Sequence, residues 1–126
     1  MFDKEKIKLF VQETLGCGCP GEVFKNIDCL SNVKIDHSAL KNKINIGNRL
    51  LIYIVELKSS EDLKQMPSLV EAGIKERDLE FNRFRLVLVT ENINGIKQAA
   101  DALFKEIDKD DRVHLHIIAT KDIPAW

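Results

Sequence analysis

The segment Cys17-Gly18-Cys19-Pro20 holds the residue types with the most chemistry in this chain of 126 residues. Two thiols one residue apart, with a glycine that lets the backbone turn between them, can bind one metal ion or close reversibly to a disulfide. A disulfide across a single residue is strained and easily reduced, so this spacing favours a labile pair. The alternative is that both side chains simply pack in the corner between two helices, because cysteine is often buried.

Cys19 and Cys17 are assigned different roles by their positions. Cys19 directly precedes Pro20, which is favoured as the first residue of a helix, and a thiolate at a helix N-terminus has a lowered pKa. We therefore expect Cys19 to be the thiolate and Cys17 its partner or resolving thiol. Cys29 is a candidate third thiol, although its neighbour Leu30 favours a place in the core.

His114 and His116 are candidate metal ligands, because residues two apart on a strand project to the same face. Together with the cysteines they would complete a tetrahedral site for zinc or another thiolate-bound metal, and His37 is a third histidine to consider. The alternative is that His114 and His116 are ordinary polar residues on the half-exposed face of a strand.

Composition bounds the class of protein. The 19 basic residues nearly balance the 20 acidic ones, so the net charge gives no general attraction to nucleic acid and we expect no nucleic-acid partner. No apolar run approaches the ~20 residues that span a bilayer, and the first residues alternate charge where a signal peptide would be apolar. Three cysteines is an odd count, which argues against a framework of disulfides. We expect a cytoplasmic protein that does not bind membranes.

The hydrophobic pattern predicts an α/β fold in a single domain over residues 1–126. A helix over residues 3–15 ends at Gly16, where glycine is favoured in a left-handed conformation, and a short helix over 20–27 follows. Residues 29–41 have no clear period, but alternating pieces predict that part of this stretch is strand. The remaining segments are an edge strand over 43–46, a hairpin turn at Gly47-Asn48, buried strands over 50–57, 83–90 and 113–120, and helices over 67–78 and 95–107.

These segments predict a small mixed, mostly parallel sheet: an N-terminal helix, a hairpin, then β-α-β-α-β. Ligands of open parallel sheets bind beyond the carboxyl ends of the strands. The residues at those ends form a further candidate site, for a small anion, with Ser59, Ser60, Thr90 and Thr120 as candidate contacts. The alternative is that they are caps and turns. The sequence has none of the glycine-rich loops that hold nucleotides, and no recognisable catalytic set.

The string Glu13-Thr14-Leu15-Gly16-Cys17-Gly18-Cys19-Pro20, continued by Glu22-Val23-Phe24, resembles the opening of a group of short uncharacterised prokaryotic proteins. Those proteins carry a similar LGCGCP segment after an N-terminal helix. The resemblance covers about a dozen residues. It implies a bacterial or archaeal source and a role for the motif, with no activity attached.

Our functional hypothesis from the sequence is a protein that uses the Cys17/Cys19 loop for metal binding or reversible thiol oxidation. The alternative is a non-catalytic binding or oligomerisation module with structural cysteines. Such a module would be a homodimer formed through a sheet edge or through the tail that ends at Trp126.

Overall fold

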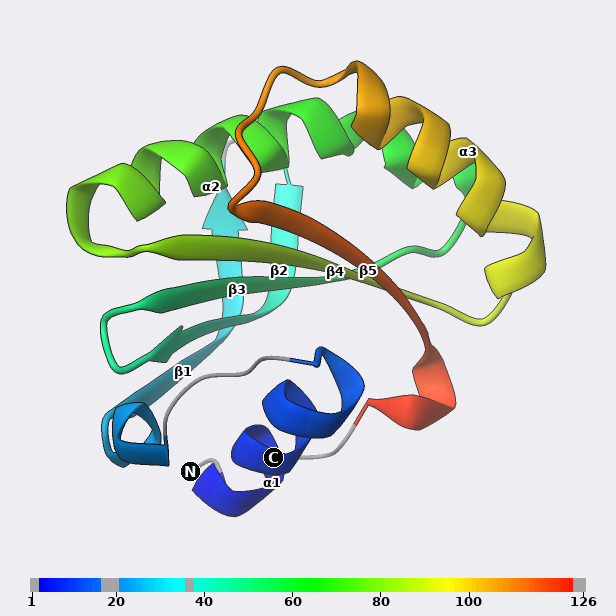
Figure 1. The fold of residues 1–126 in the computed structure, drawn as a ribbon. Helices are drawn as coiled ribbons and strands as arrows, with labels where there is room; N and C mark the ends of the chain where they lie inside the picture. The colour runs from blue at the N-terminus through cyan, green and yellow to red at the C-terminus, as the bar shows by residue number, and fades with distance from the viewer. Residues whose placement is uncertain (1–2, 17–20, 36–37, 124–126) are drawn as a thin grey trace.

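The computed structural model of the protein describes residues 3–16, 21–35 and 38–123 (Figure 1). Its elements, in chain order, are α1 (Lys4–Leu9), a π-helical turn (Phe10–Thr14), a 3-10 turn (Gly21–Lys25), β1 (Ile27–Ile35), β2 (Ser38–Ile46), β3 (Leu50–Glu56), a 3-10 turn (Ser60–Gln65), α2 (Met66–Glu80), β4 (Arg83–Thr90), α3 (Ile93–Glu106), β5 (Val113–Ala119) and a 3-10 turn (Thr120–Asp122). Across this described part of the chain, no helix is long and apolar enough to span a membrane.

The five strands form one mixed sheet in the order β1-β2-β3-β4-β5. β1 pairs antiparallel with β2 and β2 with β3, whereas β3, β4 and β5 run parallel. Gly47 and Asn48 both have positive φ, 58° and 57°, which gives the tight turn expected between β2 and β3. The predicted α/β class and mixed sheet are confirmed.

The sheet lies between two helical layers (Figure 1). α2 and α3 cover one face, and α1 with its π-helical turn covers the other. Each face has its own apolar core. The core beneath α1 includes Ile7, Phe10 and Val11, and the core beneath α2 and α3 is larger and includes Leu69 and Val70. Burial on both faces explains why β3 and β4 are almost continuously apolar.

Several helix boundaries have the local signals that are typical of helix ends. Gly16 has a φ of 68°, the left-handed conformation expected after the N-terminal helix. Asp62 accepts a hydrogen bond from the backbone N–H of Ser59 at 3.3 Å, and Pro67 lies in the first turn of α2. Asn92 caps α3 by accepting from the N–H of Gly95 at 3.1 Å.

The segment between the N-terminal helix and β3 differs most from the prediction. The expected helix over 20–27 is a single 3-10 turn over Gly21–Lys25 in the described residues. Two nine-residue strands, β1 and β2, follow it, where the sequence predicted an edge strand over 43–46 and strand in an undefined part of 29–41. Asn32, in the middle of β1, has a φ of 54°, which breaks the regular alternation that identifies a strand.

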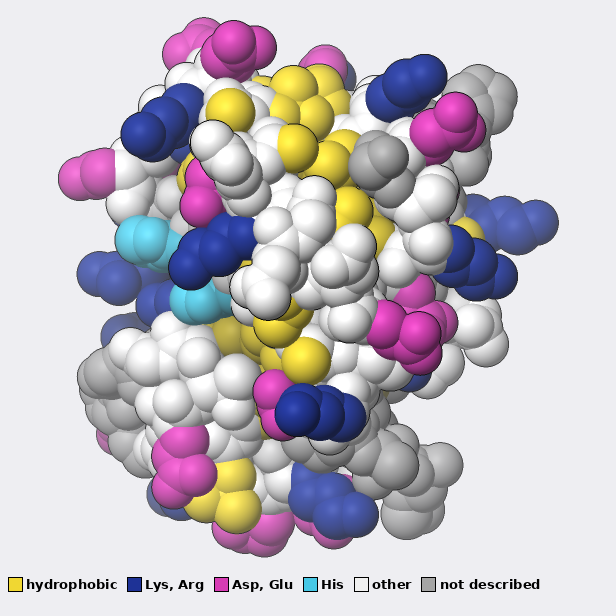
Figure 2. Space-filling model, turned by 90° about the vertical axis from the view of Figure 1, so that its right-hand side faces the viewer, with side chains coloured by type: hydrophobic (Ala, Val, Ile, Leu, Met, Phe, Trp, Pro, Cys, Tyr) yellow, Lys and Arg dark blue, Asp and Glu magenta, His cyan; other side chains and the backbone are white. Residues whose placement is uncertain are grey.

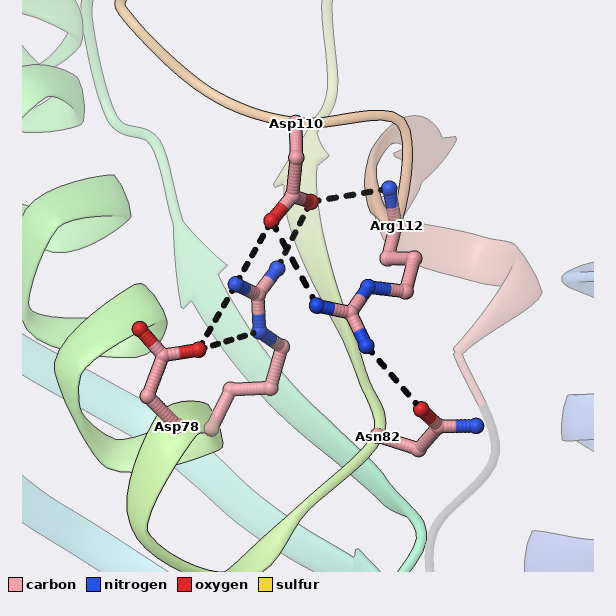
Figure 3. A network of polar contacts seen from close by, with 5 residues as sticks. Asp78, Asn82, Asp110 and Arg112 are labelled. Atoms are coloured by element: carbon pink, nitrogen blue, oxygen red, sulfur yellow. Dashed lines mark hydrogen bonds and ion pairs between the residues drawn. The ribbon is translucent and has the colours of Figure 1, made fainter.

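The end of α2 is fixed to the loop before β5 by a polar network (Figure 3). Arg77, only 2% exposed, donates to both carboxylate oxygens of Asp110 at 2.8 and 2.7 Å and also to Asp78. Arg112 donates to Asn82 Oδ1 at 3.2 Å. The bidentate pair with the Asp110 carboxylate compensates the positive charge of the buried Arg77 guanidinium.

Candidate functional site

The central residues of the sequence hypothesis, Cys17 and Cys19, lie outside the residues that the structure describes, as does His37. The tail that ends at Trp126 also lies outside them. What the structure does describe is the helix that leads to the cysteines, up to Gly16, and the sheet surface that this helix covers.

Cys29 is described, and its surroundings are those of a core residue. The side chain lies on β1, half-buried, and packs against the core beneath α1. Asn42, itself 4% exposed, donates from Nδ2 to Cys29 Sγ at 3.6 Å and to Ser31 Oγ at 3.2 Å. Burial raises the pKa of the Cys29 thiol, partly offset by the hydrogen bond from Asn42. These surroundings favour an unreactive neutral thiol at this position.

A buried arginine lies on the sheet beneath the end of the N-terminal helix. Arg85, on β4, is 7% exposed. Its NH1 group donates to the backbone carbonyl oxygen of Leu15 at 2.9 Å and is 2.8 Å from Nε2 of His116 on β5. The network therefore joins the last turn before Gly16 to the two strands β4 and β5, and it links His116, a candidate metal ligand in the sequence analysis, to this end of the helix through Arg85.

Arg85 has no carboxylate partner among the described residues, and its Nε atom is buried there without any hydrogen-bond acceptor. Burial and, second, the positive charge of Arg83 lower the pKa of the Arg85 guanidinium. Since an arginine nonetheless stays charged in proteins, a desolvated and uncompensated positive charge faces the N-terminal layer.

His116 is held as a neutral imidazole. Burial, then Arg85, then His114 lower the pKa of His116 to about 4. A guanidinium can only donate, so Nε2 of His116 must accept the hydrogen bond and the ring proton is on Nδ1. With its Nε2 lone pair occupied and a cation 2.8 Å away, His116 is a poor metal ligand through that nitrogen.

His114 lies on the same face of β5 and directly opposite Arg85 in the strand register. Burial, Arg85 and Arg83 lower the pKa of His114, and only Asp111 raises it. Figure 2 shows the two described histidines as separate cyan side chains near each other, beside lysine and arginine side chains. No group of three or more His, Cys, Asp or Glu side chains that could hold a metal ion occurs within residues 3–16, 21–35 and 38–123.

The carboxyl ends of β3, β4 and β5 meet at a second candidate site, a pocket of about 430 Å³. Thr90 and Thr120, both predicted ligand contacts, line it; the full set of polar lining residues is Glu56, Lys58, Thr90, Glu91, Asn92 and Thr120. Two glutamates and one lysine give this lining a net charge of −1, which opposes the binding of a small anion.

The predicted ligand contacts at these strand ends also have structural roles. Thr90 is 4% exposed, and its hydroxyl accepts from the N–H of Asn92 at 3.1 Å. Ser59 is exposed, donates its N–H to Asp62 and does not line the pocket, and the side chain of Ser60 is not among those described. This arrangement is that of turn and cap residues around a polar pocket.

Sequence reasoning missed Arg85, although a signal for it was present. Residues 83–90 read RFRLVLVT and predict a strand buried on both faces, and a charged side chain inside such a strand requires a partner. Comparisons with models of known protein families, with curated proteins and with solved structures found no match, so the assignment of a function depends on this geometry alone.

Proposed function

We propose that the protein carries reversible thiol redox chemistry at Cys17 and Cys19, with Arg85 supplying the positive charge that favours the thiolate. One observation carries the proposal. Arg85 donates to the carbonyl of Leu15, two residues before Cys17 in the sequence, and has no carboxylate partner among the described residues. A guanidinium near a thiol stabilises the thiolate and lowers the pKa of the thiol.

The same contacts favour redox chemistry over zinc binding. A zinc site needs anionic or neutral ligands with free lone pairs, whereas the Nε2 lone pair of His116 already accepts from Arg85. A divalent cation near this guanidinium would also meet electrostatic repulsion. Zinc bound to the purified protein in a one-to-one ratio is therefore the outcome that would replace the redox proposal with the metal alternative.

The proposed reaction is thiol–disulfide exchange with a small disulfide such as oxidised glutathione. The thiolate attacks one sulfur of that disulfide, whose S–S bond breaks and releases one thiolate. The second cysteine, after losing its proton to solvent, attacks the mixed disulfide and releases the other thiolate. Two protein thiols are thereby oxidised to one disulfide, and one disulfide is reduced to two thiols.

The direct test equilibrates the protein with reduced and oxidised glutathione and measures its intact mass after acid quenching. We expect a population lighter by two hydrogen atoms, and digestion should place the new bond between Cys17 and Cys19. The Cys29→Ser variant is the matched control and should oxidise as the wild type does, because burial raises the pKa of the Cys29 thiol and disfavours its thiolate.

Two results would contradict the redox proposal. One is a protein whose three thiols all remain reduced across the whole range of glutathione ratios. The other is oxidation that needs Cys29, since the proposal uses only the pair that the sequence places next to Gly16.

A second candidate function is assembly of a homodimer through the β1 edge of the sheet. β1 pairs with β2 on one side only, and its Leu30 side chain is 55% exposed, one of three large apolar side chains exposed to this degree in the described residues. Edge strands pair readily with a second chain. Sedimentation should then show a dimer that Leu30→Lys converts to a monomer; a monomeric wild type at all concentrations would remove this candidate.

A further inference from the structure

The face of the sheet around Arg85 concentrates positive charge. Arg83 and Arg85 on β4 and His114 and His116 on β5 are alternate residues of adjacent parallel strands, so all four project toward the face that α1 partly covers. Within the described residues, Asp111 is the one carboxylate among the charges that shift the pKa values of Arg85, His114 and His116, and it acts on His114. The remaining neighbours within the set repel one another.

Arg85 is only partly used by the protein itself. Among the described residues, its NH1 group makes both side-chain hydrogen bonds, to the carbonyl oxygen of Leu15 and to His116. The opposite edge of the guanidinium, formed by Nε and NH2, makes none within the described part of the chain, and Nε is buried. This edge presents two parallel N–H donors, which match the two oxygens of a carboxylate or phosphate group.

A buried polar atom without an acceptor costs free energy, and crowded positive charges add to that cost. The pair of Arg77 with Asp110 shows how this same protein satisfies a buried guanidinium where the need is structural. We propose that the surface formed by Arg83, Arg85, His114 and His116 binds the oxyanion group, phosphate or carboxylate, of a small molecule.

The oxyanion supplies the missing acceptor for Arg85 and the missing negative charge for its neighbours. Arg83 is exposed and His114 half-buried, so the site is open to solvent on the side of these two residues. The proposal does not depend on the thiol function, because every residue in it lies on β4 or β5.

The test titrates the full chain with inorganic phosphate and, separately, with acetate at constant ionic strength, and follows the imidazole NMR signals of His114 and His116. We expect saturable one-to-one binding of at least one of the two anions and a rise in the pKa of His116, because a nearby anion favours its protonated form. The anion that binds more tightly identifies the group, and chloride at the same ionic strength should cause no saturable shift.

Arg83→Gln should weaken binding about tenfold, because it removes one exposed charge of the site without disturbing the buried network. Arg112→Gln is the matched control, since Arg112 is also an exposed arginine at this end of the sheet but donates to Asn82. It should change the affinity less than about twofold.

Three results would overturn the proposal. The first is that neither anion shifts the histidine signals more than chloride does. The second is that Arg112→Gln weakens binding as much as Arg83→Gln, which would show nonspecific attraction. The third is binding that occurs only in a Cys17→Ser, Cys19→Ser variant, which would identify a thiolate as the counter-charge of Arg85 and leave the thiol function standing.

Discussion

Two buried arginines lie on opposite sides of the same sheet, and they differ in their hydrogen-bond partners and in the direction in which their pKa values are shifted. Arg77, beneath the loop before β5, binds Asp110 through two nitrogens and Asp78 as well, and these bonds raise the pKa of Arg77. Arg85, beneath the end of the N-terminal helix, bonds a carbonyl oxygen and a neutral imidazole, and burial lowers its pKa.

The difference separates a structural arginine from a candidate functional one. A guanidinium that is paired with carboxylates stabilises the fold, and because its positive charge is neutralised it acts little on a ligand or a nearby thiol. A guanidinium that is buried without a carboxylate costs free energy, and such uncompensated groups concentrate at functional sites. We therefore expect substitutions of Arg77 to change stability and substitutions of Arg85 to change chemistry.

The largest effect on stability should come from Arg77→Met. This variant removes the bidentate pair with Asp110 and the bonds to Asp78 while keeping the apolar stem in place. We expect a loss of about 2–3 kcal/mol in the free energy of unfolding, at the lower end for a broken buried pair because both carboxylates are partly exposed and return to water. Urea unfolding measures it, and a loss below about 1 kcal/mol would contradict the structural role.

Stability at acid pH should depend on the same pair. The bonds from Arg77 hold the pKa of Asp110 below its usual value, so the unfolded chain takes up a proton at a higher pH than the folded protein does. This contribution is complete above the unfolded pKa, near 4, and is lost as the pH falls through the folded pKa. Unfolding free energies measured from pH 5 down to 2 should fall less steeply for Asp110→Asn than for the wild type; equal slopes would exclude this contribution.

The network of Arg85 should give a pH dependence in a different window. The pKa of His116 is lowered to about 4, from 6.5 in an unperturbed histidine, so the unfolded chain binds more protons between these values. Stability should therefore decrease as the pH falls from about 6.5 to 4. His116→Gln should flatten the curve in this interval, and a variant that keeps the wild-type slope would show that another group is responsible.

The smallest effect on stability is expected at Cys29, which is part of neither arginine network. Cys29→Ser should change the free energy of unfolding by about 1 kcal/mol or less, because the site is half-buried and already has a polar neighbour in Asn42. Burial raises the pKa of Cys29, so it should be the slowest of the three thiols to react with iodoacetamide at pH 7. Peptide mapping of labelled protein checks this; fastest labelling at Cys29 would place the reactive thiol elsewhere than proposed.

The sequence predicted well those elements whose signals are local. The continuous apolar runs predicted β3, β4 and β5, and Gly16 marked the end of the N-terminal helix, as the structure confirms. Apolar continuity and capping chemistry depend only on neighbouring residues, so they are readable without a fold.

The features that were missed depend on contacts between distant segments. β1 and β2 change the core that they face along their length: Ile44 belongs to the core beneath α1, and Leu40 belongs to the one beneath α2 and α3. Because of that change, apolar and polar residues do not alternate regularly along either strand. The bond from Arg85 to Leu15 joins residues 70 positions apart, and no spacing rule predicts it. The signal that was available, a charge inside an apolar strand, indicates that a partner exists without identifying it.

The most direct test of the account measures the thiol pKa values of Cys17 and Cys19 from the pH dependence of iodoacetamide labelling, in the wild type and in Arg85→Met and Arg77→Met. We predict one thiol with a pKa at least about one unit below the usual 8.5 in the wild type, which rises to about 8.5 in Arg85→Met and stays low in folded Arg77→Met. Ordinary pKa values for both thiols in the wild type, or a low value that survives the loss of Arg85, would contradict it.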